Sequence, residues 1–94
     1  MTSTYPKELN YVLYFLHGLP DVRNESKYEK LERYILRNYD GEKFENLYSS
    51  VEWAVEHLDY DFKAIDPGLR HCKEDIVIFL NKFYFMLQSI KSKS

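Results

Sequence analysis

The chain has 94 residues, of which 45% are hydrophobic and 17% aromatic, and its formal net charge is −2. So many aromatic residues supply enough apolar area for one core without metals or disulfides, and only three Gly and three Pro argue against a loop-rich β fold. The single cysteine, Cys72, and the polar start over residues 1–5 predict a cytoplasmic protein without a signal peptide, and no apolar run is long enough to span a membrane.

The first predicted helix covers residues 6–17. Pro6 suits a first helical turn, and Gly18 with Pro20 ends the helix. Its inner stripe consists of Leu9, Val12, Leu13 and Leu16, and its outer side carries Tyr11, Tyr14 and Phe15. A helix that is apolar nearly all round is expected to be sandwiched between other helices.

The second predicted helix covers residues 26–39. Ser26 followed by Glu29 is a capping-box pattern that opens it, and Asp40 with Gly41 supplies the turn that ends it. Its inner stripe consists of Tyr28, Leu31, Ile35 and Tyr39. Because the connection to the next helix is so short, the second and third helices are expected to be antiparallel neighbours.

The last two predicted helices cover residues 42–60 and 67–91, the latter opened by Asp66 as N-cap and Pro67 in the first turn. The inner stripe of the third helix consists of Phe44, Leu47, Tyr48, Val51, Ala54, Val55 and Leu58, and that of the fourth of Leu69, Cys72, Ile76, Leu80, Phe83, Leu87 and Ile90. These patterns predict one all-α domain over residues 1–94, an antiparallel four-helix bundle with frayed ends at about 1–4 and 92–94.

The position of Trp53 is the main indication of function. On a helix, Trp53 projects about 180° away from Phe44, onto the polar side of the third helix. A large aromatic residue there is better suited to anchoring a partner than to building a core. The alternative is that the first helix or the loop over residues 61–66 covers the indole and makes a second, small core, because Trp is usually largely buried.

Acidic residues surround this tryptophan. Residues 40–66 hold eight acidic residues against two lysines, so this part of the chain is the part expected to meet a basic partner. The predicted partner-binding residues are Trp53, His57 and Tyr60, fringed by Glu45, Glu52, Glu56, Asp59 and Asp61. Trp and Tyr are favoured in interface cores, and a ring of charge supplies steering and register.

Catalytic and metal-binding patterns were not found in the sequence. The three histidines have no zinc-ligand spacing, and neither a phosphate-binding glycine loop nor a nucleophile elbow occurs. Cys72 lies on the predicted inner stripe, three residues after Leu69, and is expected to be buried and inert. We therefore expect no enzymatic activity, no cofactor and no metal.

Two other surfaces give alternative hypotheses. The first hypothesis is an interface for self-association or for an adaptor role, which consists of Ile78 and Phe85 on the outer face of the last helix with Tyr11, Tyr14 and Phe15. The outer face of the second helix carries Lys27, Lys30, Arg33 and Arg37, with Arg23 nearby. Such a stripe suits a nucleic-acid-associated regulator, although an expected Glu29–Arg33 pair would partly neutralise it.

The acidic aromatic surface is similar in character to that of bacterial immunity proteins and antitoxins, small helical proteins that neutralise nuclease toxins. The likeness is one of class and rests on no family motif. It implies that the chain is a cytoplasmic toxin inhibitor, because nucleases are typically basic near their phosphate-binding site and an acidic face with aromatic anchors can cover that site or its rim.

Overall fold

The computed structural model describes residues 6–19 and 21–93, apart from the side chain of Lys93. Its helices are α1 (Leu9–His17), α2 (Glu25–Asn38), α3 (Gly41–Glu56), α4 (Phe62–Ile65) and α5 (Lys73–Lys93). The described ranges contain no strand, so the all-α prediction is confirmed for them. Pro20 and the expected frayed residues 1–4 and 94 lie outside the described residues.

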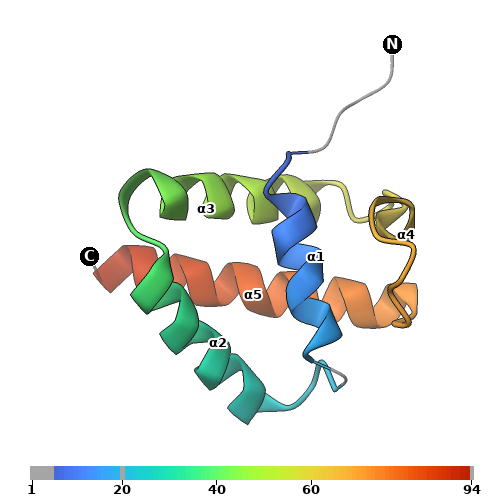
Figure 1. Ribbon diagram of the computed structural model, residues 1–94, viewed down its shortest axis with the longest axis horizontal. Coiled ribbons are helices and arrows are strands. Elements are labelled where there is room, and N and C mark those ends of the chain that lie inside the picture. Colours follow the sequence, from blue (N-terminus) through green and yellow to red (C-terminus); the bar gives the residue numbers. More distant parts are fainter. Residues whose placement is uncertain (1–5, 20, 94) are drawn as a thin grey trace.

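The helices pack around an apolar core with α5 at its centre. Figure 1 shows α3 lying along α5, α1 crossing in front of both, and α2 running obliquely away from them. The largest fully buried side chains are Phe79, Phe83, Leu9, Leu13, Leu16, Ile35, Leu47, Ile76, Leu80, Leu87, Val12 and Val22. The predicted inner stripe of the first helix is therefore correct, and those of the third and last helices are correct in most positions.

The antiparallel four-helix bundle is not confirmed. Because α1 crosses α5 and α2 diverges from α3, the helix axes do not share one direction (Figure 1). The principal contacts join α3 with α5, α1 with α3, and α2 with α5. The short connection after Asn38 turns the chain sharply instead of laying α2 along α3.

The main errors in the helix boundaries lie between residues 57 and 72. The third helix ends at Glu56, and the short helix α4 follows it, which the sequence pattern did not predict. The last helix begins at Lys73, six residues later than expected. Asp66 does not cap it, because its carboxylate accepts hydrogen bonds from the backbone N–H of Gly68 (3.2 Å) and from His17 Nε2 (2.7 Å). The aspartate thus closes its own turn, at residues 66–68, and joins that turn to His17 at the end of α1.

The cap of α2 differs by two residues from the predicted one. Asn24 is the N-cap, and its side-chain oxygen accepts hydrogen bonds from the Ser26 backbone N–H (3.1 Å) and hydroxyl (2.7 Å).

At the start of α3 the backbone of Gly41 has φ +53°, in the left-handed region that glycine adopts without a Cβ penalty. This residue makes the sharp turn between α2 and α3 possible.

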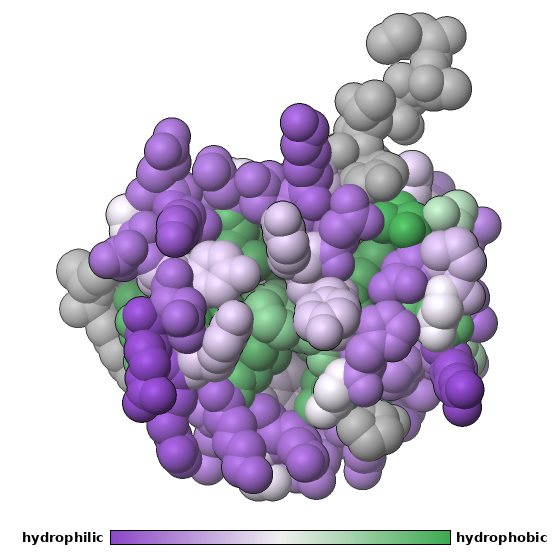
Figure 2. All heavy atoms as spheres, viewed as in Figure 1, coloured by the Kyte–Doolittle hydropathy of each residue, from purple (hydrophilic) through white to green (hydrophobic). Residues whose placement is uncertain are grey.

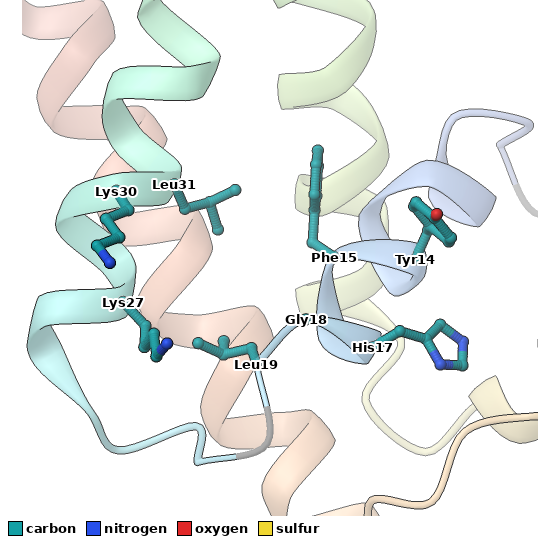
Figure 3. Close-up of a pocket in the computed structure, with 8 residues that line it drawn as sticks. All are labelled: Tyr14, Phe15, His17, Gly18, Leu19, Lys27, Lys30 and Leu31. Atoms are coloured by element: carbon teal, nitrogen blue, oxygen red, sulfur yellow. The ribbon is translucent and has the colours of Figure 1, made fainter.

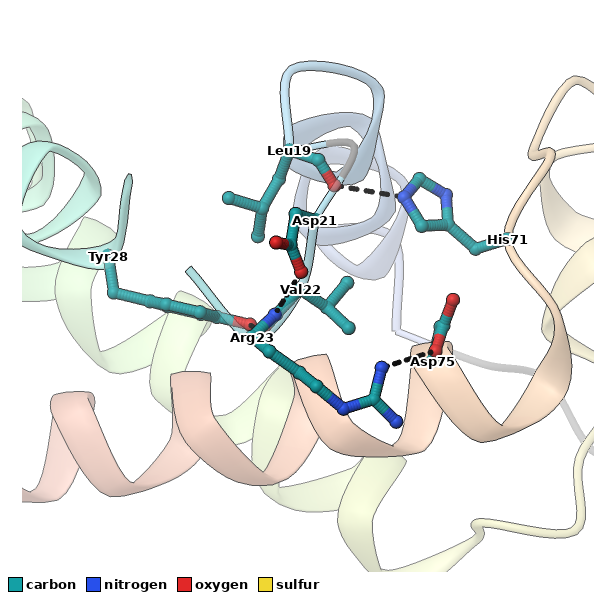
Figure 4. Close-up of polar contacts among 7 residues, drawn as sticks. All are labelled: Leu19, Asp21, Val22, Arg23, Tyr28, His71 and Asp75. Carbon is teal, nitrogen blue, oxygen red and sulfur yellow. Dashed lines mark hydrogen bonds and ion pairs between the residues drawn. The ribbon is translucent and has the colours of Figure 1, made fainter. Parts of the chain in front are cut away.

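The loop between α1 and α2 is tied to the start of α5 by polar contacts (Figure 4). His71 Nε2–H donates to the Leu19 carbonyl oxygen at 2.9 Å, and Arg23 pairs with Asp75 at 3.5 Å. The buried Tyr28 hydroxyl donates to the Val22 carbonyl oxygen at 2.7 Å. These contacts hold the loop, and with it the start of α2, against the start of α5.

Candidate protein-binding surface

Trp53 is partly buried and packs against the edge of the core. Its indole stacks on the imidazole of His57, with ring centroids 4.1 Å apart and planes 15° apart, and meets Tyr60 edge-on at 5.3 Å. Tyr60 in turn contacts Phe62, the buried residue of α4. The indole is therefore neither fully exposed nor in a closed second core: it is the middle ring of an aromatic cluster at the end of α3.

His57 holds this cluster in place at the C-terminal end of α3. It is the C-cap residue, and its Nδ1–H donates to the Trp53 carbonyl oxygen at 2.7 Å. The imidazole remains exposed on its other side. One ring thus satisfies a terminal helix carbonyl and covers one face of the indole, which explains why Trp53 is partly buried on an otherwise polar helix face.

The predicted acidic fringe divides into two groups. Glu56, Asp59 and Asp61 are exposed and make no ion pair within the described part of the chain. Glu45 pairs with Lys91 of α5 at 3.8 Å, and Glu52 is partly buried. The first group neighbours His57 and Tyr60 in the sequence, whereas the second lies along the contact between α3 and α5.

The contact between α3 and α5 contains a tyrosine pair that the sequence did not indicate. Tyr84 donates to the Glu52 carboxylate at 3.1 Å and packs against Tyr48 with ring centroids 5.5 Å apart, while the Lys91 ammonium lies 4.5 Å from the Tyr48 ring centroid. The pKa of Tyr84 is raised by its hydrogen-bonding interaction with Tyr48, then by desolvation and by Glu52. Glu52 therefore helps to join the two helices.

Two lysines approach the acidic end of α3. A small cavity of about 150 Å³ is lined by Asp59, Asp61, Lys63, Lys73 and neighbouring residues. The last turn of α3 itself contains no basic residue, so the negative end of the helix dipole adds to the field of Glu56 and Asp59. The lysines of α4 and α5 mark one border of the acidic area.

The residues of the alternative apolar interface do not share one hollow. Tyr14 and Phe15 line a groove between α1 and α2, whereas Phe85 lines another between α2 and α5. Tyr11, Tyr14 and Phe85 are 61%, 68% and 73% exposed, so the expected sandwiching of α1 is wrong for its tyrosines. Phe15 and Ile78 are partly buried.

The basic face of α2 lacks the neutralising pair expected within it. Glu29 and Arg33 do not come within ion-pair distance, and no other described residue pairs with Lys27, Lys30 or Arg37. Arg23 instead pairs with Asp75. Glu25, Glu29 and Glu32 face the groove beside α5, while Lys27 and Lys30 face that beside α1. Helix α2 thus separates its charges onto two flanks.

The expectation that Cys72 is buried is wrong. Cys72 is exposed because it lies in the loop before Lys73, where α5 begins, and so it is not on the helical stripe that the sequence pattern predicts. Its neighbour His71 has a buried Nδ1 atom without a hydrogen-bond partner among the described residues.

The described residues contain no group of three potential metal ligands, and none of their helices has both the length and the hydropathy needed to cross a membrane.

Comparison of the chain with protein-family models, with curated proteins and with solved structures found no match.

Proposed function

We propose that this chain is a protein-binding module that recognises a basic protein through an acidic aromatic surface at the C-terminal end of α3. This surface consists of Trp53, Glu56, His57, Asp59, Tyr60 and Asp61. The observation that carries the proposal is the partly exposed stack of Trp53 on His57, in a stretch of chain whose three carboxylates, those of Glu56, Asp59 and Asp61, are exposed. Glu45 and Glu52 extend the acidic rim along α3.

Electrostatics supports a basic partner. Glu56, Asp59 and Asp61 lie near the negative end of the α3 dipole, where cations would normally be favoured, and no described residue pairs with them. This arrangement raises the local negative potential without stabilising the helix. A partner with a positive surface would neutralise this negative potential, and the attraction between the two surfaces would speed the association of the partner with this chain.

The aromatic cluster supports a role as anchor. Interface hot spots are enriched in Trp and Tyr at sites that become fully desolvated in the complex. Because Trp53 is already held between His57 and Tyr60, little side-chain entropy is lost when a partner covers it. The indole and phenol rings would supply apolar contact, and the surrounding carboxylates would set the register.

The class of partner that we propose is a nuclease-like toxin domain, whose phosphate-binding site is basic. In this role the chain would act in the cytoplasm as an immunity or antitoxin protein, without chemistry of its own. The acidic surface would cover the toxin's positive site or its rim. Fast electrostatic association with slow release is the expected kinetic behaviour.

Affinity capture with matched baits tests the proposal. The baits are the wild-type chain, the double variant Glu56→Lys/Asp59→Lys, and the control Glu29→Lys/Glu32→Lys, which changes the charge equally on α2. We expect a basic protein to be retained by the wild type and the control and lost by the first variant. Retention by all three baits, or equal loss from both variants, would contradict the proposal.

Two observations keep the alternatives open to test. The exposed Tyr11, Tyr14 and Phe85 favour self-association, which predicts a mass that rises with concentration. The unpaired Lys27, Lys30 and Arg37 favour binding to nucleic acid, which predicts salt-dependent retention on DNA. Monomeric behaviour at high concentration eliminates the first, and no retention at low salt eliminates the second.

A further inference from the structure

A groove separates the C-terminal half of α1 from the first half of α2 (Figure 3). Its volume is about 530 Å³. We call it the α1–α2 groove; the residues that define it are Tyr14, Phe15, Leu19, Lys27, Lys30 and Leu31. None of these residues belongs to the acidic aromatic surface on α3.

The floor of the α1–α2 groove is apolar. Leu19 is buried, and Phe15 and Leu31 are partly buried; the Leu31 side chain extends from α2 toward the side of the gap where Phe15 lies (Figure 3). The Phe15 ring makes edge-on contacts with the rings of Phe83 and Tyr34, with centroids 5.9 Å and 5.8 Å from its own. The floor is therefore held in position by the core before any ligand arrives.

Tyr14 lines the groove beside this floor, and Tyr34 contacts Phe15 of the floor. Tyr11, Tyr14 and Tyr34 are 61%, 68% and 49% exposed, and a second hollow of about 440 Å³, lined partly by Tyr11, Tyr34 and Tyr39, lies beyond Tyr34. Figure 2 shows apolar green atoms recessed at the centre of this face, with paler and purple side chains around them. Such exposed tyrosines around an apolar hollow are typical of interface surfaces.

The charge along the groove is positive. The amino groups of Lys27 and Lys30 lie on the α2 side of the groove (Figure 3), and neither makes an ion pair with a described residue. The opposite flank of α2 carries the glutamates that face α5. An occupant of the α1–α2 groove therefore meets two lysines, while the glutamates remain behind the helix.

We propose that the α1–α2 groove is a docking site for an acidic segment of another protein. An aliphatic or aromatic side chain of that segment would occupy the space between Phe15 and Leu31, and its carboxylates would pair with Lys27 and Lys30. Nucleic acid fits less well, because the glutamates on the other flank of α2 would repel a phosphate backbone that continued across the helix. The site is independent of the acidic aromatic surface and opposite to it in charge.

Binding of synthetic peptides tests this site directly. The probe is a pool of fluorescent 15-residue peptides with Leu or Phe three and four residues apart and Glu or Asp at the flanking positions, matched by peptides with Gln or Lys in place of the acids. We expect acidic members to bind with Kd below ~1 mM and the Lys-substituted peptides not to bind. No binding by any acidic peptide, or equal binding by the Lys-substituted ones, would overturn the proposal.

Charge-matched variants locate the binding. Lys27→Glu/Lys30→Glu should weaken peptide binding at least ~10-fold, whereas Arg33→Glu/Arg37→Glu, with the same charge change on the same helix but outside the groove, should weaken it less than ~3-fold. Equal weakening by both variants would indicate diffuse attraction and refute the site. Because Lys30, Arg33 and Arg37 are exposed and Lys27 is only partly buried, circular dichroism should show an unchanged fold in both variants.

The apolar contact has its own matched pair. Tyr14→Ala should weaken peptide binding, and Phe85→Ala should not, although both side chains are strongly exposed.

An oligonucleotide that binds more tightly than every acidic peptide and loses binding in Lys27→Glu/Lys30→Glu would overturn the proposal in favour of nucleic acid. Self-association abolished by Tyr14→Ala would overturn it in favour of a second copy. Trp53 variants should leave peptide binding unchanged, which separates this site from the one on α3.

Discussion

The indole of Trp53 and the imidazole of His57 form a stacked pair at the end of α3, with ring centroids 4.1 Å apart, and the same imidazole donates a hydrogen bond to the Trp53 carbonyl oxygen. The pair therefore links a helix terminus to an aromatic surface. Because residues four apart lie on adjacent turns of one helix face, this contact needs no support from distant elements. A change at either residue should affect the surface and the helix end together.

Replacing Trp53 tests how far the indole belongs to the core. Trp53→Ala should lower the free energy of unfolding by about 1–2 kcal/mol, because the ring is only partly buried. Phe79→Ala, at a site with no exposed area, should cost about 3–5 kcal/mol. Urea denaturation of both variants checks this. Equal losses would place Trp53 in the core and remove the proposed anchor.

The turn before α3 depends on glycine at one position. Gly41→Ala should destabilise the fold by about 1–2 kcal/mol, because its φ of +53° is costly for a residue with a Cβ although no atom lies within 4 Å of one. Gly18→Ala is the control: its φ is −96°, and the added Cβ would make only an ordinary contact with the Phe15 carbonyl oxygen at 3.8 Å. Thermal unfolding that ranks the two in reverse order would refute this account of the turn.

The buried hydroxyl of Tyr28 predicts a loss of stability in alkali. Desolvation, then the charges of Glu25 and Asp21, raise the pKa of Tyr28 above its ordinary value. The protonated hydroxyl contributes fully to the free energy of unfolding below the pKa of about 10 that tyrosine has in the unfolded chain. This contribution is lost as the pH rises from there through the pKa in the folded protein, because the unfolded chain releases the proton first.

Tyr28→Phe isolates this contribution. Below pH ~10 the variant should be less stable than the wild type by about 0.5–1.5 kcal/mol, because the Val22 carbonyl loses its hydrogen bond. The difference should shrink at higher pH. Urea denaturation on both sides of that pH provides the measurement, with Tyr14→Phe as an exposed control. A difference that stays constant with pH would contradict the assigned cause.

Cys72 should react with a thiol reagent in the folded protein. The thiol is exposed in the loop before α5, so labelling should not require unfolding. Its rate in buffer should approach the rate in denaturant, as followed by mass spectrometry. Protection by several orders of magnitude would mean that the helix begins before Lys73, as the sequence pattern had suggested.

The sequence predicted the helices best where the pattern was long and periodic. The apolar spacing of α3 and α5 identifies Leu47, Val51, Leu80 and Leu87 as core residues, and all four are fully buried. Crossing angles are not encoded in that spacing. They depend on contacts far apart in sequence, such as Phe15 with Phe83, and the bundle geometry could not be predicted from the sequence.

The loop between α4 and α5 was missed because Asp66 and Pro67 have the chemistry of a helix start. In the fold, Asp66 instead bonds to His17, 49 residues earlier, and this tertiary contact outweighs the local preference. The candidate surface on α3 was easier to foresee, since helical periodicity alone places Trp53 beside His57. The sequence did not show that Glu45 and Glu52 differ from the other acidic residues. That difference depends on where α5 lies, because its Lys91 pairs with Glu45 and its Tyr84 donates to Glu52.

Affinity for the captured basic partner, measured by calorimetry for the wild type and for Trp53→Phe, tests the proposed binding function most directly. The conservative variant preserves an aromatic ring beside His57, so its fold should remain intact. We predict that it loses about 2 kcal/mol of binding free energy, which is about 30-fold in Kd. An unchanged Kd in a folded Trp53→Phe variant would contradict recognition through this surface.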